Sequence, residues 1–129
     1  MLGGRLTLLL AYLLVLPVAA AAQEGDSEEG RKLATKHCAR CHVVGDFNPY
    51  GGVGNTPSFQ RLATNFPDYL ERFQTFYERP PHPPFVRSPG VERSRNLPAN
   101  AKPFKVTPEN IEDIIAFVEV LKEQEQAKQ

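Results

Sequence analysis

The segment from residue 79 to residue 106 places the strictest limit on the fold, because it contains seven prolines. Proline lacks a backbone N–H and fixes φ, so neither a long helix nor a central strand fits in this segment. A stretch of this length without regular structure is usually either disordered or wrapped around a ligand. The regular elements are therefore expected in the rest of the chain.

The C-terminal segment, residues 107–123, gives the clearest helix signal. Thr107 is a typical N-cap, and Pro108 suits the first helical position. Apolar residues then recur at helical spacing and form one stripe. The stripe consists of Ile111, Ile114, Ile115, Val118 and Leu121.

Earlier segments give weaker helix signals. Residues 26–38 begin with a candidate cap, Asp26 or Ser27, and have acidic residues in the first turn. Residues 45–56 are rich in Gly, Asn and Pro and are predicted to be loop.

Two further helical segments are expected in the middle of the chain. Residues 57–63 suffice for one or two turns, and residues 66–78 predict a better helix with Pro67 at its start. The apolar side of that helix would hold Leu70, Phe73, Phe76 and Tyr77. Because no run of alternating residues predicts a strand, we expect an all-α domain of three to four helices with long loops.

Residues 1–22 have the pattern of a secretory signal peptide. Arg5 gives a positive start, the run from Leu6 to Leu16 is nearly all apolar, and small residues lead to Ala22. The apolar run is too short to cross a bilayer comfortably, so cleavage after Ala22 is expected. An uncleaved membrane tether is the alternative. Cleavage leaves residues 23–129 as one small domain with an exported, periplasmic location.

The charge balance argues against nucleic-acid binding. Loss of Arg5 leaves 14 basic residues against 15 acidic ones, a net charge of −1. Nonspecific nucleic-acid binding needs a basic footprint. Residues 61–105 nevertheless carry eight basic and four acidic residues. This basic middle is either a docking surface for an acidic partner or an ordinary solvated surface.

Both cysteines of the chain lie in one five-residue motif, Cys38-x-x-Cys41-His42. A thioredoxin-like redox pair requires a βαβ context, and a structural zinc site requires four ligands. A disulfide across so short a loop gives little stabilisation. Cys-x-x-Cys-His is the attachment pattern of c-type haem, which is completed outside the cytoplasm. The motif therefore predicts one covalent haem c, bound through Cys38 and Cys41, with His42 as the proximal iron ligand.

On these residues the chain resembles the class I cytochrome c family over most of residues 23–129. Gly30 stands where that family has a small residue at the crossing of its first and last helices, and Phe117 matches the aromatic packed against it. Pro57 resembles the loop proline whose carbonyl accepts a hydrogen bond from the ligating histidine, here His42. The resemblance implies a cytochrome c fold with long loops wrapped around the haem.

The second axial ligand departs from the family pattern. Most class I cytochromes use methionine, and the only methionine here is Met1. Residues 81–85, Pro-His-Pro-Pro-Phe, resemble the ligand loop Pro-His-Pro-Pro-Met of some bacterial relatives. Phe85 then occupies the position of the sulfur, and a phenyl ring cannot ligate iron. The usual basis for predicting a high potential is therefore missing.

Three options remain for the distal side of the iron. His82 could ligate it, Lys102 or Lys105 could do so after losing a proton, or Phe85 could cap an open five-coordinate site. Neutral imidazole is a good ligand, whereas lysine is deprotonated only at a cost, so His82 is the leading candidate.

Other side chains are expected near the haem without ligating it. His37 directly precedes Cys38 and is expected at the helix surface near the cofactor, too far from the distal face. Aromatic residues can pack on the haem or belong to the ordinary core. These are Tyr50, Phe59, Phe85 and Phe104.

The leading functional hypothesis is a periplasmic cytochrome that carries single electrons between redox protein partners, a donor and an acceptor, or serves as the electron-entry subunit of an oxidoreductase. No substrate chemistry is expected. The alternative is a five-coordinate haem protein that binds a small gas or peroxide, as a sensor or weak peroxidase. No distal Arg or His pair for peroxide chemistry stands out. Residues 86–103 have no assigned role beyond a partner-binding loop or a cover over the haem edge.

Overall fold

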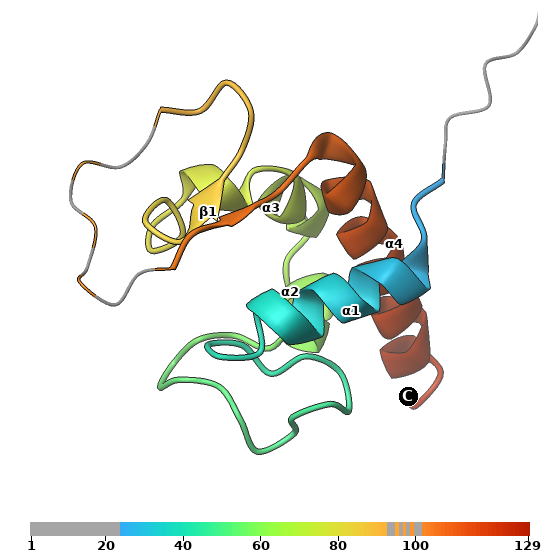
Figure 1. Cartoon of the computed structure of the whole chain (residues 1–129). Helices are drawn as coiled ribbons and strands as arrows, with labels where there is room; N and C mark the ends of the chain where they lie inside the picture. The colour runs from blue at the N-terminus through green and yellow to red at the C-terminus, as the bar shows by residue number, and fades with distance from the viewer. Residues whose placement is uncertain (1–23, 93–94, 96, 98, 100–101) are drawn as a thin grey trace, which may run out of the picture.

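The computed structural model describes residues 24–92, 95, 97, 99 and 102–129, and the predicted signal peptide lies outside these residues. Within them the chain forms four α-helices, one short 3-10 helix and two very short strands (Figure 1). The helices are α1 (Ser27–His37), α2 (Phe59–Asn65), α3 (Tyr69–Gln74), η1 (Phe76–Glu78) and α4 (Pro108–Gln126), and the strands are β1 (Val86–Arg87) and β2 (Phe104–Lys105). No helix of this described part is long and apolar enough to span a membrane. The prediction of an all-α domain with long loops is confirmed.

Helices α1 and α4 cross in backbone contact (Figure 1). A Cβ added to Gly30 would overlap the backbone of Asp113 and Ile114, so only glycine allows this approach. The Asp26 backbone N–H also donates to Asp113 Oδ1 at 2.8 Å. Gly30 thus lies at the helix crossing, as predicted. Phe117 is buried one turn further along α4, where its ring approaches Gly45.

Both long helices begin at caps that the sequence indicates. The N-cap of α1 is Asp26, whose Oδ1 accepts the backbone N–H groups of Glu28 and Glu29. In α4, Thr107 Oγ1 accepts the Asn110 N–H at 3.3 Å, and Asn110 Oδ1 accepts the Thr107 N–H at 3.2 Å. Such a reciprocal pair satisfies backbone donors that the first helical turn leaves free.

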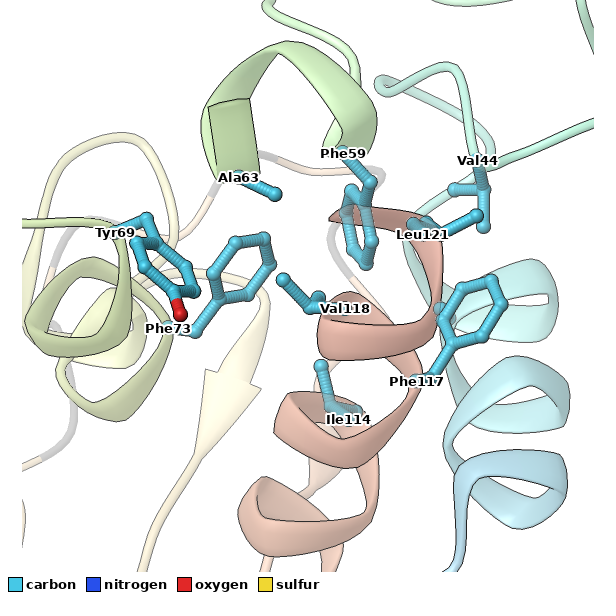
Figure 2. Close-up of a cluster of buried hydrophobic side chains, with 10 residues drawn as sticks. Val44, Phe59, Ala63, Tyr69, Phe73, Ile114, Phe117, Val118 and Leu121 are labelled. Carbon is cyan, nitrogen blue, oxygen red and sulfur yellow. The ribbon is translucent and has the colours of Figure 1, made fainter. Parts of the chain in front are cut away.

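The main core lies between α4 and the shorter helices (Figure 2). Phe59 and Ala63 of α2 and Tyr69 and Phe73 of α3 point toward one side of α4, while Val44 packs on the other side. The core residues of α4 are Ile114, Phe117, Val118 and Leu121. The apolar stripe predicted for this helix is therefore mostly buried, and Ile115 lies at its margin.

The helix predicted over residues 66–78 is divided into two helices, and the face that it buries differs from the predicted one. It forms α3 and then η1, with Thr75 between them donating its hydroxyl to the Glu71 carbonyl at 2.7 Å. Leu70, expected on the apolar face, is 40% exposed, whereas Tyr69 is 9% exposed. Tyr69 buries its ring and donates its hydroxyl to Glu119 at 2.6 Å, so both parts of this side chain are satisfied in the core.

A second, smaller apolar cluster holds the two strands, which the sequence did not predict. Strands β1 and β2 pair in parallel, with Val86 opposite Phe104 and Arg87 opposite Lys105. Two residues are too few to show an alternating pattern, so the strands give no sequence signal. The cluster consists of Val86, Val106 and Ile111, with Phe76, Tyr77, Phe85, Phe104 and Ile115 packed against it. The pairing brings residues 86–87, inside the proline-rich segment, next to its C-terminal end.

Candidate functional site

The Cys38-x-x-Cys41-His42 motif forms a tight turn at the end of α1. Cys38 is the C-cap of the helix, and its carbonyl accepts the backbone N–H groups of Cys41 and His42 at 3.0 and 2.9 Å. Both thiols are free. Burial, with the neighbouring Cys41 as a second cause, raises the pKa of the Cys38 thiol to about 12.

The His42 ring is oriented by the loop that follows the motif. Its Nδ1 lies 2.8 Å from the Pro57 carbonyl oxygen. A carbonyl only accepts hydrogen bonds, so Nδ1 carries the proton and Nε2 keeps its lone pair for a metal. The Phe59 ring meets the His42 ring edge-on, with centres 5.6 Å apart. The structure thus has the contact that the family resemblance implies between Pro57 and His42.

Asn48 holds this loop in place, and the sequence analysis missed it. Its Nδ2 donates to the carbonyls of Ala39 and His42 at 3.0 and 2.9 Å, and its Oδ1 accepts the Val44 N–H at 2.8 Å. One amide side chain therefore closes the turn that contains the motif. An asparagine in a Gly- and Pro-rich stretch signals a turn, but its partners depend on the path of the folded chain.

His82 lies beside His42 in space, although the two are 40 positions apart in the chain. The ring centres are 6.1 Å apart and the ring planes differ by 5°. His82 Nδ1 lies 3.0 Å from the Arg79 carbonyl oxygen, so its Nε2 is also free to bind a metal. Burial lowers the pKa of His82 below its ordinary value, opposed by that carbonyl and reinforced by His42. The neutral, ligating form is therefore favoured at neutral pH.

The other candidate distal groups are either exposed or packed in an apolar cluster. Phe85 packs against the second apolar cluster, and Lys102 and Lys105 are exposed. The Lys105 side chain projects to solvent from β2. Among the candidate distal ligands, His82 is the one with an observed position beside His42.

The remaining predicted residues are divided between the site and its surroundings. His37 stacks on Phe104, with ring centres 4.1 Å apart and planes at 9°. Burial, followed by the charge of Lys36, lowers the pKa of His37. Tyr50 is fully exposed in the loop after the motif.

The donor set of the site fits a covalently bound haem. Two free thiols and a histidine with Nε2 available lie within five residues of one turn. Among the residues that the structure describes, no three or more His, Cys, Asp or Glu side chains gather as a metal-binding group. The four-ligand zinc alternative therefore has no ligand set in that part of the chain.

The family comparison covers most of the chain. A family model described as Cytochrome c matches residues 27–122. No curated protein and no solved structure gives a significant match. The matched region begins at the first residue of α1, contains the whole motif and both histidines of the pair, and ends in the last turns of α4.

Proposed function

Because the chain belongs to the cytochrome c family, we propose that it carries single electrons between two redox proteins outside the cytoplasm. The family generally consists of electron carriers and holds haem c covalently. The observation that carries the proposal is the Cys38-x-x-Cys41-His42 turn, with His42 Nδ1 fixed on the Pro57 carbonyl. This turn presents the two thiols and one imidazole that the attached cofactor requires.

Each residue of the site has a defined part in this function. Cys38 and Cys41 supply the sulfurs of the two thioether bonds, which keep the cofactor on the chain while partners exchange. His42 supplies Nε2 as the proximal ligand, and Pro57 fixes its tautomer and ring direction. Haem c supplies a one-electron iron couple when it is bound, so the chain itself needs no acid, base or nucleophile.

Export of the protein is the second part of the proposal. Residues 1–22 are proposed to be a signal peptide, with residues 23–129 as the periplasmic domain, because their charge, apolar run and small residues follow the secretory pattern. Haem attachment supports this location, because it is completed outside the cytoplasm.

The partners are proposed to be a donor and an acceptor protein, of which at least one presents an acidic surface. The support is the uneven charge: residues 61–105 are twice as rich in basic as in acidic residues. Arg61, Arg87, Lys102 and Lys105 are all exposed. Nucleic acid is not proposed as a partner, since the chain as a whole has no excess of positive charge.

Purified protein tests the proposal directly. The expected protein begins at Gln23 by mass, keeps its haem on a denaturing gel and is reduced and reoxidised reversibly by one electron. Cys38→Ala with Cys41→Ala should abolish haem retention on the gel, because no thioether can form. Loss of haem from the wild-type chain on the gel would contradict the proposal, and stoichiometric carbon monoxide binding would favour a gas-binding protein instead.

A further inference from the structure

We propose that His82 is the second axial ligand of the iron, and that the chain holds its ring nearly parallel to the ring of His42. Phe76 and the Arg79 carbonyl are the groups that set this orientation. The inference rests on the proposed haem function and adds the ligand that the family pattern leaves open, since the chain has no methionine to serve there.

The separation of the two rings matches the space that one metal ion needs. A metal–imidazole bond is about 2 Å long and the ring centre lies about 1 Å behind the nitrogen, so two imidazoles on one iron have centres about 6 Å apart. The centres of His42 and His82 are 6.1 Å apart. Rings in direct stacking contact lie closer, as His37 and Phe104 do at 4.1 Å.

Both imidazoles are prepared for ligation in the same way. His42 Nδ1 bonds the Pro57 carbonyl, and His82 Nδ1 bonds the Arg79 carbonyl. Each bond requires the proton on Nδ1 and leaves Nε2 as the free donor atom. A histidine that ligates a metal usually gives its other N–H to such an acceptor, which fixes the ring and raises the basicity of the ligating nitrogen.

The direction of the His82 ring is fixed from two further sides. The Phe76 ring meets it edge-on, with centres 5.4 Å apart and planes at 88°. The His82 backbone is also tied, because its N–H donates to Arg79 at 2.9 Å and its carbonyl accepts the Phe85 and Val86 N–H groups at 2.8 and 3.1 Å. These bonds connect the ligand loop to β1 and to the second apolar cluster. The loop that carries His82 is therefore held in place by backbone hydrogen bonds on both sides of this residue.

The competing distal groups are used for other purposes. Phe85, at the position of the family methionine, fills the second apolar cluster with Val86 and Val106. Lys102 and Lys105 are exposed and need deprotonation before they can bind iron. His82 is half-buried, and its ring centre already lies at the distance from the His42 ring centre that one bridging metal ion needs.

The spectrum of the oxidised wild-type protein gives the first test, because it does not depend on any variant folding. Two nearly parallel imidazole planes give a rhombic low-spin ferric EPR signal, whereas perpendicular planes give a strongly anisotropic one. We expect the rhombic signal, without the near-infrared charge-transfer band of a sulfur ligand. A high-spin signal, or the sulfur-ligand band, would overturn the assignment.

A matched pair of histidine variants then identifies the ligand. His82→Ala should convert the iron to a high-spin form that binds carbon monoxide, and added imidazole should restore the low-spin spectrum. His37→Ala is the control, because His37 stacks on Phe104 and should leave the spectrum unchanged. A low-spin spectrum that survives in His82→Ala without added imidazole would reject His82. Haem retention on a denaturing gel separates the two proposals: a wild-type chain without haem refutes the electron-transfer function, whereas a haem-bearing His82→Ala with an unchanged spectrum refutes only the ligand.

Phe76 is tested as a positioning residue and not as a ligand. Phe76→Ala should keep the iron low-spin but broaden or shift the EPR signal, because the His82 ring loses its edge-on contact. Phe76→Tyr should restore the wild-type signal, since it keeps the aromatic edge. An unchanged EPR signal in Phe76→Ala would show that Phe76 does not orient the His82 ring.

Discussion

At the scale of single residues, the distal ligand decides the redox potential. A haem iron held by two imidazoles has a lower potential than one held by histidine and methionine, because the thioether favours the reduced state. With His82 in this proposed role, the protein is expected at the low-potential end of the family range.

His82→Met is expected to raise the midpoint potential, because it places a thioether on the side of the ligand loop that faces His42. Potentiometric titration of both proteins measures the change. His37→Met is the matched control: it adds the same side chain on α1, where His37 stacks on Phe104, and should leave the potential nearly unchanged. An equal potential in His82→Met and the wild type would contradict the role of His82.

At the scale of elements, the contact between α1 and α4 positions the motif. The motif begins at the C-cap of α1, so the angle and depth of α1 on α4 determine where Cys38 and His42 lie. Gly30 sets that depth, because its lack of a side chain lets the two backbones meet. The crossing of α1 and α4 thus contributes to the stability of the fold and also sets the position of Cys38 and His42.

Gly30→Ala is expected to destabilise the holoprotein by about 1–3 kcal/mol, since the added methyl group overlaps the Asp113 carbonyl and forces the helices apart. The intrinsic helix preference for alanine, about 1 kcal/mol, opposes only part of this loss. Denaturant unfolding followed by circular dichroism measures it. Lys36→Ala replaces an exposed residue on the same helix and should change the free energy of unfolding by no more than about 0.5 kcal/mol. A Gly30→Ala protein as stable as Lys36→Ala would show that the crossing tolerates a side chain.

At the scale of the whole molecule, net charge and charge distribution have different consequences. The domain is nearly neutral overall, so long-range steering by net charge is weak. The basic residues of the 61–105 segment act only locally, because screening limits their range to about 10 Å at 0.1 M salt. Partner docking should therefore depend on where these exposed basic side chains lie relative to the partner.

Electron exchange with a small anionic oxidant is expected to slow as ionic strength rises, whereas exchange with a cationic oxidant should not slow. Stopped-flow kinetics at several salt concentrations measures both. Lys102→Glu with Lys105→Glu should weaken the salt dependence for the anion, since both side chains are exposed. Equal salt dependence for the two oxidants would show that the basic residues do not lie near the route of electron exchange.

The sequence by itself determined the features that depend on neighbouring residues. The caps at Asp26 and Thr107 and the Cys38-x-x-Cys41-His42 motif involve partners within a few positions. Their energies are local, so the order of residues is enough to predict the helix starts, the all-α class and the haem attachment.

Only the tertiary structure decided which distant groups meet. It placed His82 beside His42, gave Asn48 its carbonyl partners and buried Tyr69 in place of Leu70. Each of these outcomes depends on the packing of helices and loops that are far apart in the chain, and no pattern of adjacent residues encodes such a distance. The attachment of the haem is thus read from five consecutive residues, whereas the candidate for its second ligand is chosen by the fold.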